Sequence, residues 1–246
     1  MATDLADPLA NIPAIIRGLI AVAWFGLQTY LASVAVVLLA IKLWPGLAPY
    51  ADVSAHGFAG LSLLGWIGFG IMWIAQAVVF WRGMDAIRKF IDFCGPAVWV
   101  VMFLLAGYLV IEAGWENIDF NLADGGITLT AWAVLPVLLS AIALVVSYFS
   151  GPMLNYGDFA RYGKSFAAIK KGNFLGLPVN FLVFSLLVVI TAAATRPVYG
   201  ELIIDPVHTV ARLDNVYAVI LGALTFMIAT VGINIVANFV SPKVGL

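Results

Sequence analysis

Charged residues are scarce in this sequence: Asp, Glu, Lys and Arg make up 10% of its 246 residues, against about 25% in a soluble domain. The 12 basic and 13 acidic residues leave a formal net charge of −1, which excludes the cationic surface that nucleic-acid binding requires. A chain with so few charges also lacks the polar surface that a water-soluble domain of this length needs. The sequence is therefore not that of a soluble globular protein.

Cysteine and histidine are almost absent as well. Cys94 is the single cysteine, which excludes a disulfide framework and a cysteine-based metal cage. The two histidines, His56 and His208, lie far apart and outside the apolar runs, so their spacing predicts no metal site. The sequence shows neither paired carboxylates nor a nucleophile beside a base. We therefore expect no enzymatic activity, no resident metal and no cofactor.

Apolar residues dominate instead, at 63% of the chain with a mean hydropathy of +1.06. A helix that crosses the ~30 Å hydrocarbon layer needs about 20 apolar residues. The apolar runs are continuous rather than alternating, which favours helices over a β-barrel. We predict an all-α membrane protein in which residues 1–246 form a single transmembrane domain. Its six predicted transmembrane helices span about residues 12–43, 60–80, 95–111, 129–154, 174–193 and 216–240.

The charges between these runs predict the orientation in the membrane. If the N-terminus is cytoplasmic, most basic residues fall in inner segments and most acidic residues in outer ones, as the positive-inside rule requires. We expect a multi-pass protein of the plasma (inner) membrane with both termini cytoplasmic. The basic stretch 81–90 is expected to be an amphipathic collar that contacts anionic lipid headgroups. The inner basic residues are Arg17, Arg82, Arg88, Lys89, Arg161, Lys164, Lys170, Lys171 and Lys243, the outer basic residues are Lys42, Arg196 and Arg212, and the outer acidic residues are Asp52, Glu112, Glu116, Asp119, Asp124, Glu201, Asp205 and Asp214.

Two pairs of uncharged polar or aromatic residues lie inside the apolar runs. Trp24 and Gln28 are four residues apart and share one helical face, as do Asn234 and Asn238. An indole is a flat apolar wall and a carboxamide both donates and accepts hydrogen bonds, so either pair could line a site for a planar heterocycle. Polar side chains at membrane depth also commonly bond a neighbouring helix. The spacing alone leaves both interpretations open.

The fourth apolar run ends in residues 148–152, which include Phe149 and the pair Gly151-Pro152. Proline removes one backbone N–H and clashes with the preceding turn, and interrupted helices mark substrate sites in transporters. We expect a helix break here that keeps Phe149 directed at a cavity. The alternative is an ordinary proline kink, as we expect at Pro178.

Three segments of the sequence resemble helices of one transporter family. The family is the nucleobase–cation symporters, whose third transmembrane helix resembles residues 11–33 (NIPAIIRGLIAVAWFGLQTYLAS). Its sixth helix and the following loop resemble residues 147–165 (SYFSGPMLNYGDFARYGKS), and its eighth helix resembles residues 229–242 (ATVGINIVANFVSP). The resemblance implies helices three to eight of a LeuT-like inverted-repeat fold. It also implies secondary transport, as symport, of a nucleobase or a related heterocycle such as uracil, cytosine, allantoin or hydantoin. The alternative is a truncated, non-transporting membrane remnant or an interaction subunit of a permease.

The resemblance further implies roles for individual residues. The family's stacking tryptophan falls on Trp24, its hydrogen-bonding glutamine on Gln28 and its eighth-helix asparagine on Asn238. The aromatic residue that closes the other face of the site falls on Phe149. Together these residues would hold a flat heterocycle between two rings and bond its edge with amides. Stacking of a base on an aromatic ring is worth about 1–3 kcal/mol.

The expected coupling ion follows from a departure from the family pattern. Where sodium-dependent relatives carry two threonines on the eighth helix, this sequence has Gly232 and Ile233. A sodium ion needs oxygen ligands, and neither side chain supplies one. The resemblance therefore implies no sodium site here and leaves the proton as the expected coupling ion.

Overall fold

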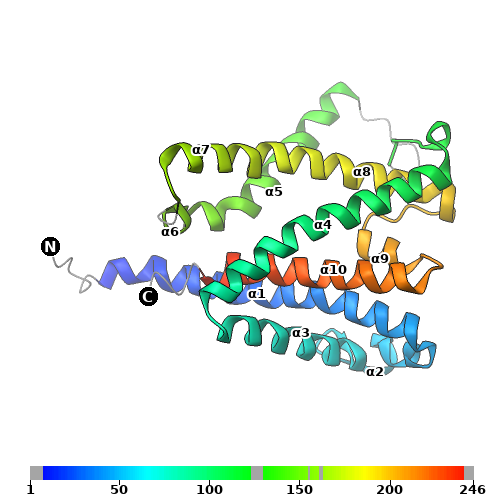
Figure 1. Ribbon diagram of the computed structural model, residues 1–246, viewed down its shortest axis with the longest axis horizontal. Helices are drawn as coiled ribbons and strands as arrows, with labels where there is room; N and C mark the ends of the chain where they lie inside the picture. The colour runs from blue at the N-terminus through cyan, green and yellow to red at the C-terminus, as the bar shows by residue number, and fades with distance from the viewer. Residues whose placement is uncertain (1–7, 123–129, 155, 161–162, 241–246) are drawn as a thin grey trace.

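A computed structural model describes residues 8–122, 130–154, 156–160 and 163–240, and these residues are almost entirely helical (Figure 1). Among them, five helices are long and apolar enough to cross a membrane and a further apolar helix is shorter, which confirms an all-α membrane fold. The elements are α1 (Pro8–Leu43), the 3₁₀ helix η1 (Pro45–Ala51), α2 (Val53–His56), β1 (Gly57–Phe58), β2 (Leu61–Ser62), α3 (Leu63–Trp81), α4 (Met84–Ala113), the 3₁₀ helix η2 (Trp115–Asn117), α5 (Ala131–Leu154), α6 (Tyr156–Ala160), α7 (Phe166–Phe174), the π-helix η3 (Leu175–Val179), α8 (Asn180–Tyr199), α9 (Pro206–Ala211), α10 (Val216–Ile235) and the π-helix η4 (Val236–Val240).

The five long helices coincide with five of the six predicted spans, but two of them begin earlier than expected. The third span is part of α4, which starts at Met84 and so takes in most of the stretch expected to be an interfacial collar. The fifth span starts at Phe166 and continues through η3, which contains Pro178. A proline cannot donate to the preceding turn, and a π-helical turn accommodates the lost bond without ending the helix.

The remaining predicted span corresponds to α5, whose described apolar part, Trp132–Ser147, is shorter than the other spans. α5 stays helical through Gly151 and Pro152 to Leu154. The expected helix break at this pair is therefore wrong. A proline inside a helix removes a single backbone hydrogen bond, and the bonds on either side can hold the helix together.

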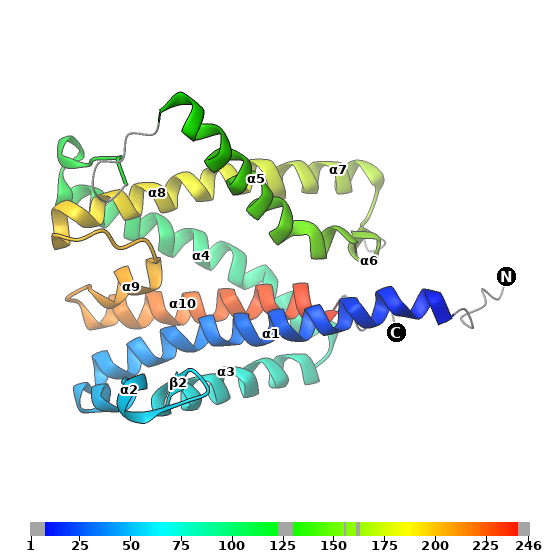
Figure 2. The same cartoon turned by 180° about the vertical axis from the view of Figure 1, so that it is seen from behind.

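Three helices distant in sequence form the frame of the molecule. α1 packs along α10 and against α3, and α4 lies between α10 on one side and α8 on the other (Figures 1 and 2). α5 crosses α8 in both views and packs little on the other described helices (Figures 1 and 2). The frame is therefore the α1–α3–α10 unit, to which α4 and α8 are added as a second layer.

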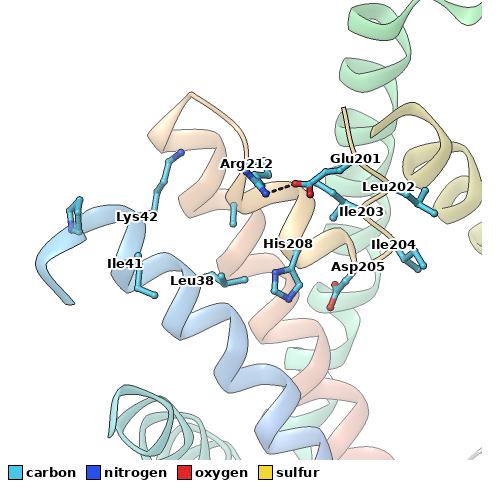
Figure 3. Close-up of a pocket in the computed structure, with 12 residues that line it drawn as sticks. Leu38, Ile41, Lys42, Glu201, Leu202, Ile203, Ile204, Asp205, His208 and Arg212 are labelled. Atoms are coloured by element: carbon cyan, nitrogen blue, oxygen red, sulfur yellow. Dashed lines mark hydrogen bonds and ion pairs between the residues drawn. The ribbon is translucent and has the colours of Figure 1, made fainter. Parts of the chain in front are cut away.

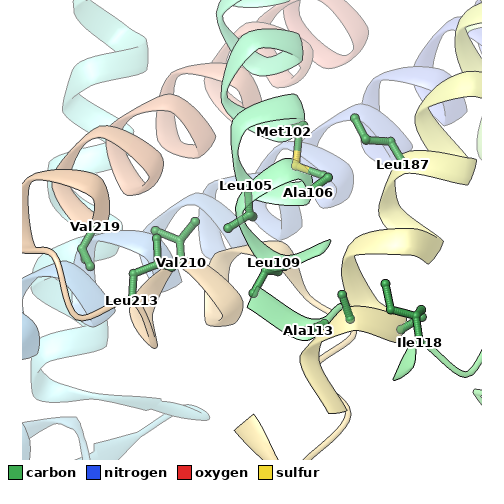
Figure 4. Packing of buried hydrophobic residues seen from close by; sticks show 12 residues of the cluster. Met102, Leu105, Ala106, Leu109, Ala113, Ile118, Leu187, Val210, Leu213 and Val219 are labelled. Atoms are coloured by element: carbon green, nitrogen blue, oxygen red, sulfur yellow. The ribbon is translucent and has the colours of Figure 1, made fainter. Parts of the chain in front are cut away.

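The larger hydrophobic cluster lies where α4 meets α8, α9 and α10 (Figure 4). Met102 and Leu109 of α4 are fully buried, and they face small residues such as Ala193 and Ala194 of α8. Small side chains let membrane helices approach closely, and dispersion contacts then hold them together. A second cluster joins α1, α3, the start of α4 and α10 through the residues Ala32, Ala35, Met72, Ile87, Ala223, Met227, Val231 and Ile235.

Polar side chains cap several helices at the end of the molecule where α3, α9 and α10 begin. Ser62 accepts a hydrogen bond from the N–H of Gly65, Asp205 from that of Val207, and Asn215 from those of the first turn of α10. Each cap pairs a backbone N–H that has no partner within its helix, which explains where these helices start. At the same end, hydrogen bonds from the hydroxyl and N–H of Ser54 hold the pKa of Asp52 below its ordinary value.

The two ends of the bundle carry opposite charges. The start of α1 and the end of α10 lie at the same end, together with the end of α3, the start of α4 and α7 (Figure 1). These elements and their borders carry the predicted inner basic residues, whereas the other end carries most of the acidic ones. Of the predicted inner and outer charges, Arg161, Lys243 and Asp124 lie outside the described residues.

This charge separation predicts that the basic end faces the cytoplasm. In a Cys94→Ala background, a cysteine at Glu116 should react with a membrane-impermeant thiol reagent in intact cells, and a cysteine at Lys164 should react only after lysis. Glu116 and Lys164 are both exposed, so burial would not explain a lack of labelling. Labelling of both positions in intact cells, or of Lys164 alone, would contradict this topology.

Candidate functional site

Trp24 and Gln28 lie one turn apart on α1, as their spacing predicts. Trp24 is 38% exposed and Gln28 is half-buried. Within the described residues, no hydrogen bond to the side chain of Gln28 is formed. The adjacent Thr29 is fully buried and faces the other helices. α1 therefore presents an indole and an amide along the border between its buried and exposed faces.

A buried polar network joins α1, α3 and α10 beside this border. Gln76 of α3 and Asn234 of α10 are almost completely buried, and Asn234 Nδ2 donates to Gln76 Oε1 at 2.6 Å. Thr29 Oγ1 accepts from Gln76 Nε2 at 3.0 Å and from Asn234 Nδ2 at 3.3 Å. The hydroxyl of Thr29 and Asn234 Nδ2 also donate to the carbonyl oxygen of Phe25, at 2.7 and 3.1 Å. The network thus gives each of these polar side chains a partner away from water.

Asn238 extends this network toward the surface of the frame. Asn238 lies half-buried in η4, and its Nδ2 donates to Asn234 Oδ1 at 2.9 Å. One residue earlier, the carbonyl oxygen of Ala237 accepts a bond of 2.9 Å from Arg17 Nη2. The bond from Arg17 and the packing of η4 on α1 place η4 along the first half of α1. The sequence left open whether the asparagine pair lines a site or bonds neighbouring helices. Asn234 bonds neighbouring helices.

Sequence reasoning overlooked Gln76 and Thr29, on which this network depends. Gln76 is the one amide within α3, and a lone amide inside an apolar span is a signal that it bonds another helix. Thr29 gives a weaker signal, because a threonine in a helix can bond the carbonyl four residues back without any outside partner. Only the packing of α3 and α10 on α1 reveals that the Thr29 hydroxyl also accepts hydrogen bonds from Gln76 and Asn234.

The structure does not bring all the predicted site residues together. Phe149 lies in α5, but its side chain lies outside the described residues. α5 does not pack extensively on α1, and the described side chains along 132–147 are exposed. An exposed apolar helix suits contact with lipid or with other membrane helices. The role of Phe149 as the second aromatic wall stays a prediction.

A cavity lies elsewhere, at the end of the bundle with the acidic residues (Figure 3). It has a volume of about 640 Å³ and is open to the surface between the end of α1 and the segment leading into α9. Two of the basic side chains that line it have partners: Arg212 pairs with Glu201, and Lys42 Nζ donates to the carbonyl oxygen of Leu213 at 2.8 Å. None of the predicted site residues lines this cavity. The predicted site at Trp24, Gln28 and Asn238 therefore lies apart from this cavity.

The described residues offer little to bind a metal ion. They contain no group of three or more His, Cys, Asp or Glu side chains suited to a metal. At the two positions where sodium-dependent relatives carry threonines, Gly232 is buried against Cys94 and Phe90, and Ile233 is 53% exposed. Neither position supplies a side-chain oxygen.

Comparison with known proteins relates the chain to permeases. A family model described as a permease for cytosine/purines, uracil, thiamine and allantoin matches residues 9–246. The chain is 30% identical over 236 residues to the allantoin permease of Bacillus subtilis, covering 95% of this chain and 47% of that protein. It is 28% identical over 234 residues to the purine-uracil permease NCS1 of Arabidopsis thaliana, covering 95% and 38%. The chain therefore spans about half the length of these relatives or less, and no solved structure matches it.

The buried network should stabilise the frame in a way that a double-mutant cycle detects. Gln76→Met or Asn234→Leu alone should lower the free energy of unfolding by about 1–3 kcal/mol, because each leaves a buried partner without a hydrogen bond. The combined variant should recover much of the loss, since both partners are then apolar. Thermal unfolding in detergent measures this.

Thr225→Val is the matched control for this cycle. Thr225 is buried in α10, and among the described residues its hydroxyl donates only to the carbonyl oxygen of Leu221 in the same helix. Its replacement should therefore cost less than either single change in the network. Losses that simply add in the Gln76→Met/Asn234→Leu variant would show that the two amides do not stabilise the frame through their mutual bond.

Proposed function

Because this chain belongs to the family of permeases for cytosine/purines, uracil, thiamine and allantoin, we propose that it binds a nucleobase or a related heterocycle for transport across a membrane. Uracil, cytosine, allantoin and hydantoin are the candidate substrates. The observation that supports the proposal is that η4, which carries Asn238, packs along α1, the helix that carries Trp24 and Gln28. An aromatic face and two amides in one region match the chemistry of a flat, amide-containing ring.

Each of these residues has a separate task in the proposed site. The exposed part of the Trp24 ring provides a stacking surface, and stacking on an aromatic ring is worth about 1–3 kcal/mol per base. The amides of Gln28 and Asn238 hydrogen-bond the edge of the ring, since a carboxamide offers both a donor and an acceptor. Phe149 is the fourth member of the proposed site and would cover the opposite face of the ligand when α5 approaches α1.

We propose coupling to protons rather than to sodium, in a protein of the plasma membrane with both termini in the cytoplasm. The support is the chemistry at Gly232 and Ile233, whose side chains offer no oxygen ligand for sodium. The support for the orientation is the concentration of basic residues at the end of the bundle that holds the start of α1.

The alternative is a membrane protein that belongs to the same family but does not transport, for example an interaction subunit. This alternative is considered because the chain spans about half the length of its relatives or less. Binding and uptake distinguish the two functions. A transporter both binds the heterocycle and accumulates it in proteoliposomes, whereas an interaction subunit does neither on its own.

Gln28→Ala should weaken the binding of uracil or allantoin at least about tenfold, because it removes a hydrogen-bonding group from a partly buried site. Equilibrium binding of the radiolabelled compounds to membranes that contain the chain measures the affinity. Leu31→Ala, an exposed position one turn away on α1, is the control and should leave affinity and membrane insertion unchanged. Equal affinity of Gln28→Ala and the parent chain would remove Gln28 from the site.

The affinity for the heterocycle should not depend on sodium. A coupled sodium ion would raise the affinity by about fivefold or more, since the two ligands would stabilise the same state. Binding measured in sodium chloride and in choline chloride at equal ionic strength should therefore agree. A higher affinity in sodium would contradict proton coupling and would place a sodium site in the chain.

A further inference from the structure

We propose that Gln76 and Asn234 are positioning residues, which hold the carboxamide of Asn238 so that its oxygen faces the ligand. This site then selects heterocycles that donate an N–H to Asn238. The inference rests on the proposed function, because it assigns the direction of one hydrogen bond within that same site.

The first fixed point of this arrangement is a backbone carbonyl of α3. Gln76 Nε2 lies 3.1 Å from the carbonyl oxygen of Met72. A carbonyl oxygen only accepts hydrogen bonds, so the atom of Gln76 that faces it must be the nitrogen. The Oε1 atom of Gln76 must then face Asn234, where it can only accept.

The second fixed point is a backbone carbonyl of α1. The carbonyl oxygen of Phe25 accepts from the hydroxyl of Thr29 at 2.7 Å and from Asn234 Nδ2 at 3.1 Å. This leaves Thr29 with lone pairs only, which accept from the nitrogens of Gln76 and Asn234. Both fixed points therefore require the same orientation of Asn234, with its nitrogen turned into the frame.

The orientation of Asn238 follows from that of Asn234. With its nitrogen turned inward, Asn234 presents Oδ1 to Asn238, and this atom accepts from Asn238 Nδ2 at 2.9 Å. The Oδ1 atom of Asn238 is consequently the atom turned away from the network. In the described part of the chain, no donor contacts this oxygen. A free asparagine side chain could rotate by half a turn and offer either atom, but this one is held in a single direction.

A fixed acceptor defines the chemistry of the ligand that it recognises. Uracil, allantoin and hydantoin all carry ring N–H groups that can donate to Asn238 Oδ1. A ligand with a methyl group on that nitrogen leaves the oxygen without a partner in a half-buried position, which is costly. The network thus explains how the chain could distinguish an unsubstituted ring from its N-methylated form. Since Asn234 is itself fully buried, it acts through Asn238 and does not touch the ligand.

Competition binding tests this inference with two ligand series. Membranes that contain the parent chain are assayed with uracil, 1-methyluracil and 3-methyluracil, and with hydantoin and its two N-methylated forms. In at least one series, methylation of one ring nitrogen should weaken binding about tenfold or more. The combined variant Gln76→Met/Asn234→Leu leaves Asn238 in place but releases its carboxamide. This variant should reduce the ratio between the unsubstituted and methylated ligand to about threefold or less, because a rotated amide retains its packing while changing the atom that it offers.

The control and the possible outcomes separate positioning from a general structural effect. Met72→Leu changes a buried side chain on the same helix without removing the backbone carbonyl that orients Gln76, so it should keep the parent's ratio. A double variant that binds all ligands more weakly but with the parent's ratio would overturn the inference and leave the proposed function intact. Equal binding of methylated and unsubstituted ligands by the parent chain would also overturn the inference and leave the proposed function intact. No saturable binding of any of these compounds by the parent chain would overturn the proposed function, and this inference with it.

Discussion

The requirement that every polar group inside a membrane finds a partner within the protein governs this structure. Gln76 and Asn234 are buried where water cannot reach them, and each is paired with the other and with α1. Two backbone carbonyls, those of Met72 and Phe25, determine the direction of all these bonds. The relative positions of α1, α3 and α10 are therefore set by polar contacts as well as by apolar packing.

The candidate site depends on this constraint, because its residues lie at the border of the network. Asn238 takes its orientation from Asn234, and Trp24 and Gln28 lie beside the buried Thr29 on α1. In the proposed site, the frame therefore forms one wall. The predicted opposite wall, Phe149, belongs to α5, which packs little on α1.

The sequence predicts the spans well because a membrane helix is recognised by the length and continuity of its apolar run. It also predicts that Trp24 and Gln28 lie one turn apart on the same helix, because helical spacing is a local property. It does not reveal Gln76 as the partner of Asn234, because that bond joins positions 158 residues apart and depends on how α3 and α10 pack on α1. The break expected at Gly151-Pro152 was wrong because proline weakens a helix without necessarily ending it.

An experimental structure of the chain in lipid with uracil or allantoin bound would test this account most directly. The account predicts the ligand between α1 and η4, stacked on Trp24, within hydrogen-bonding distance of Gln28, and with a ring N–H directed at Asn238 Oδ1. It also predicts that Gln76 and Asn234 keep their mutual bond. A ligand found instead in the cavity beside Lys42 and Arg212, with Trp24 and Asn238 uncontacted, would contradict it.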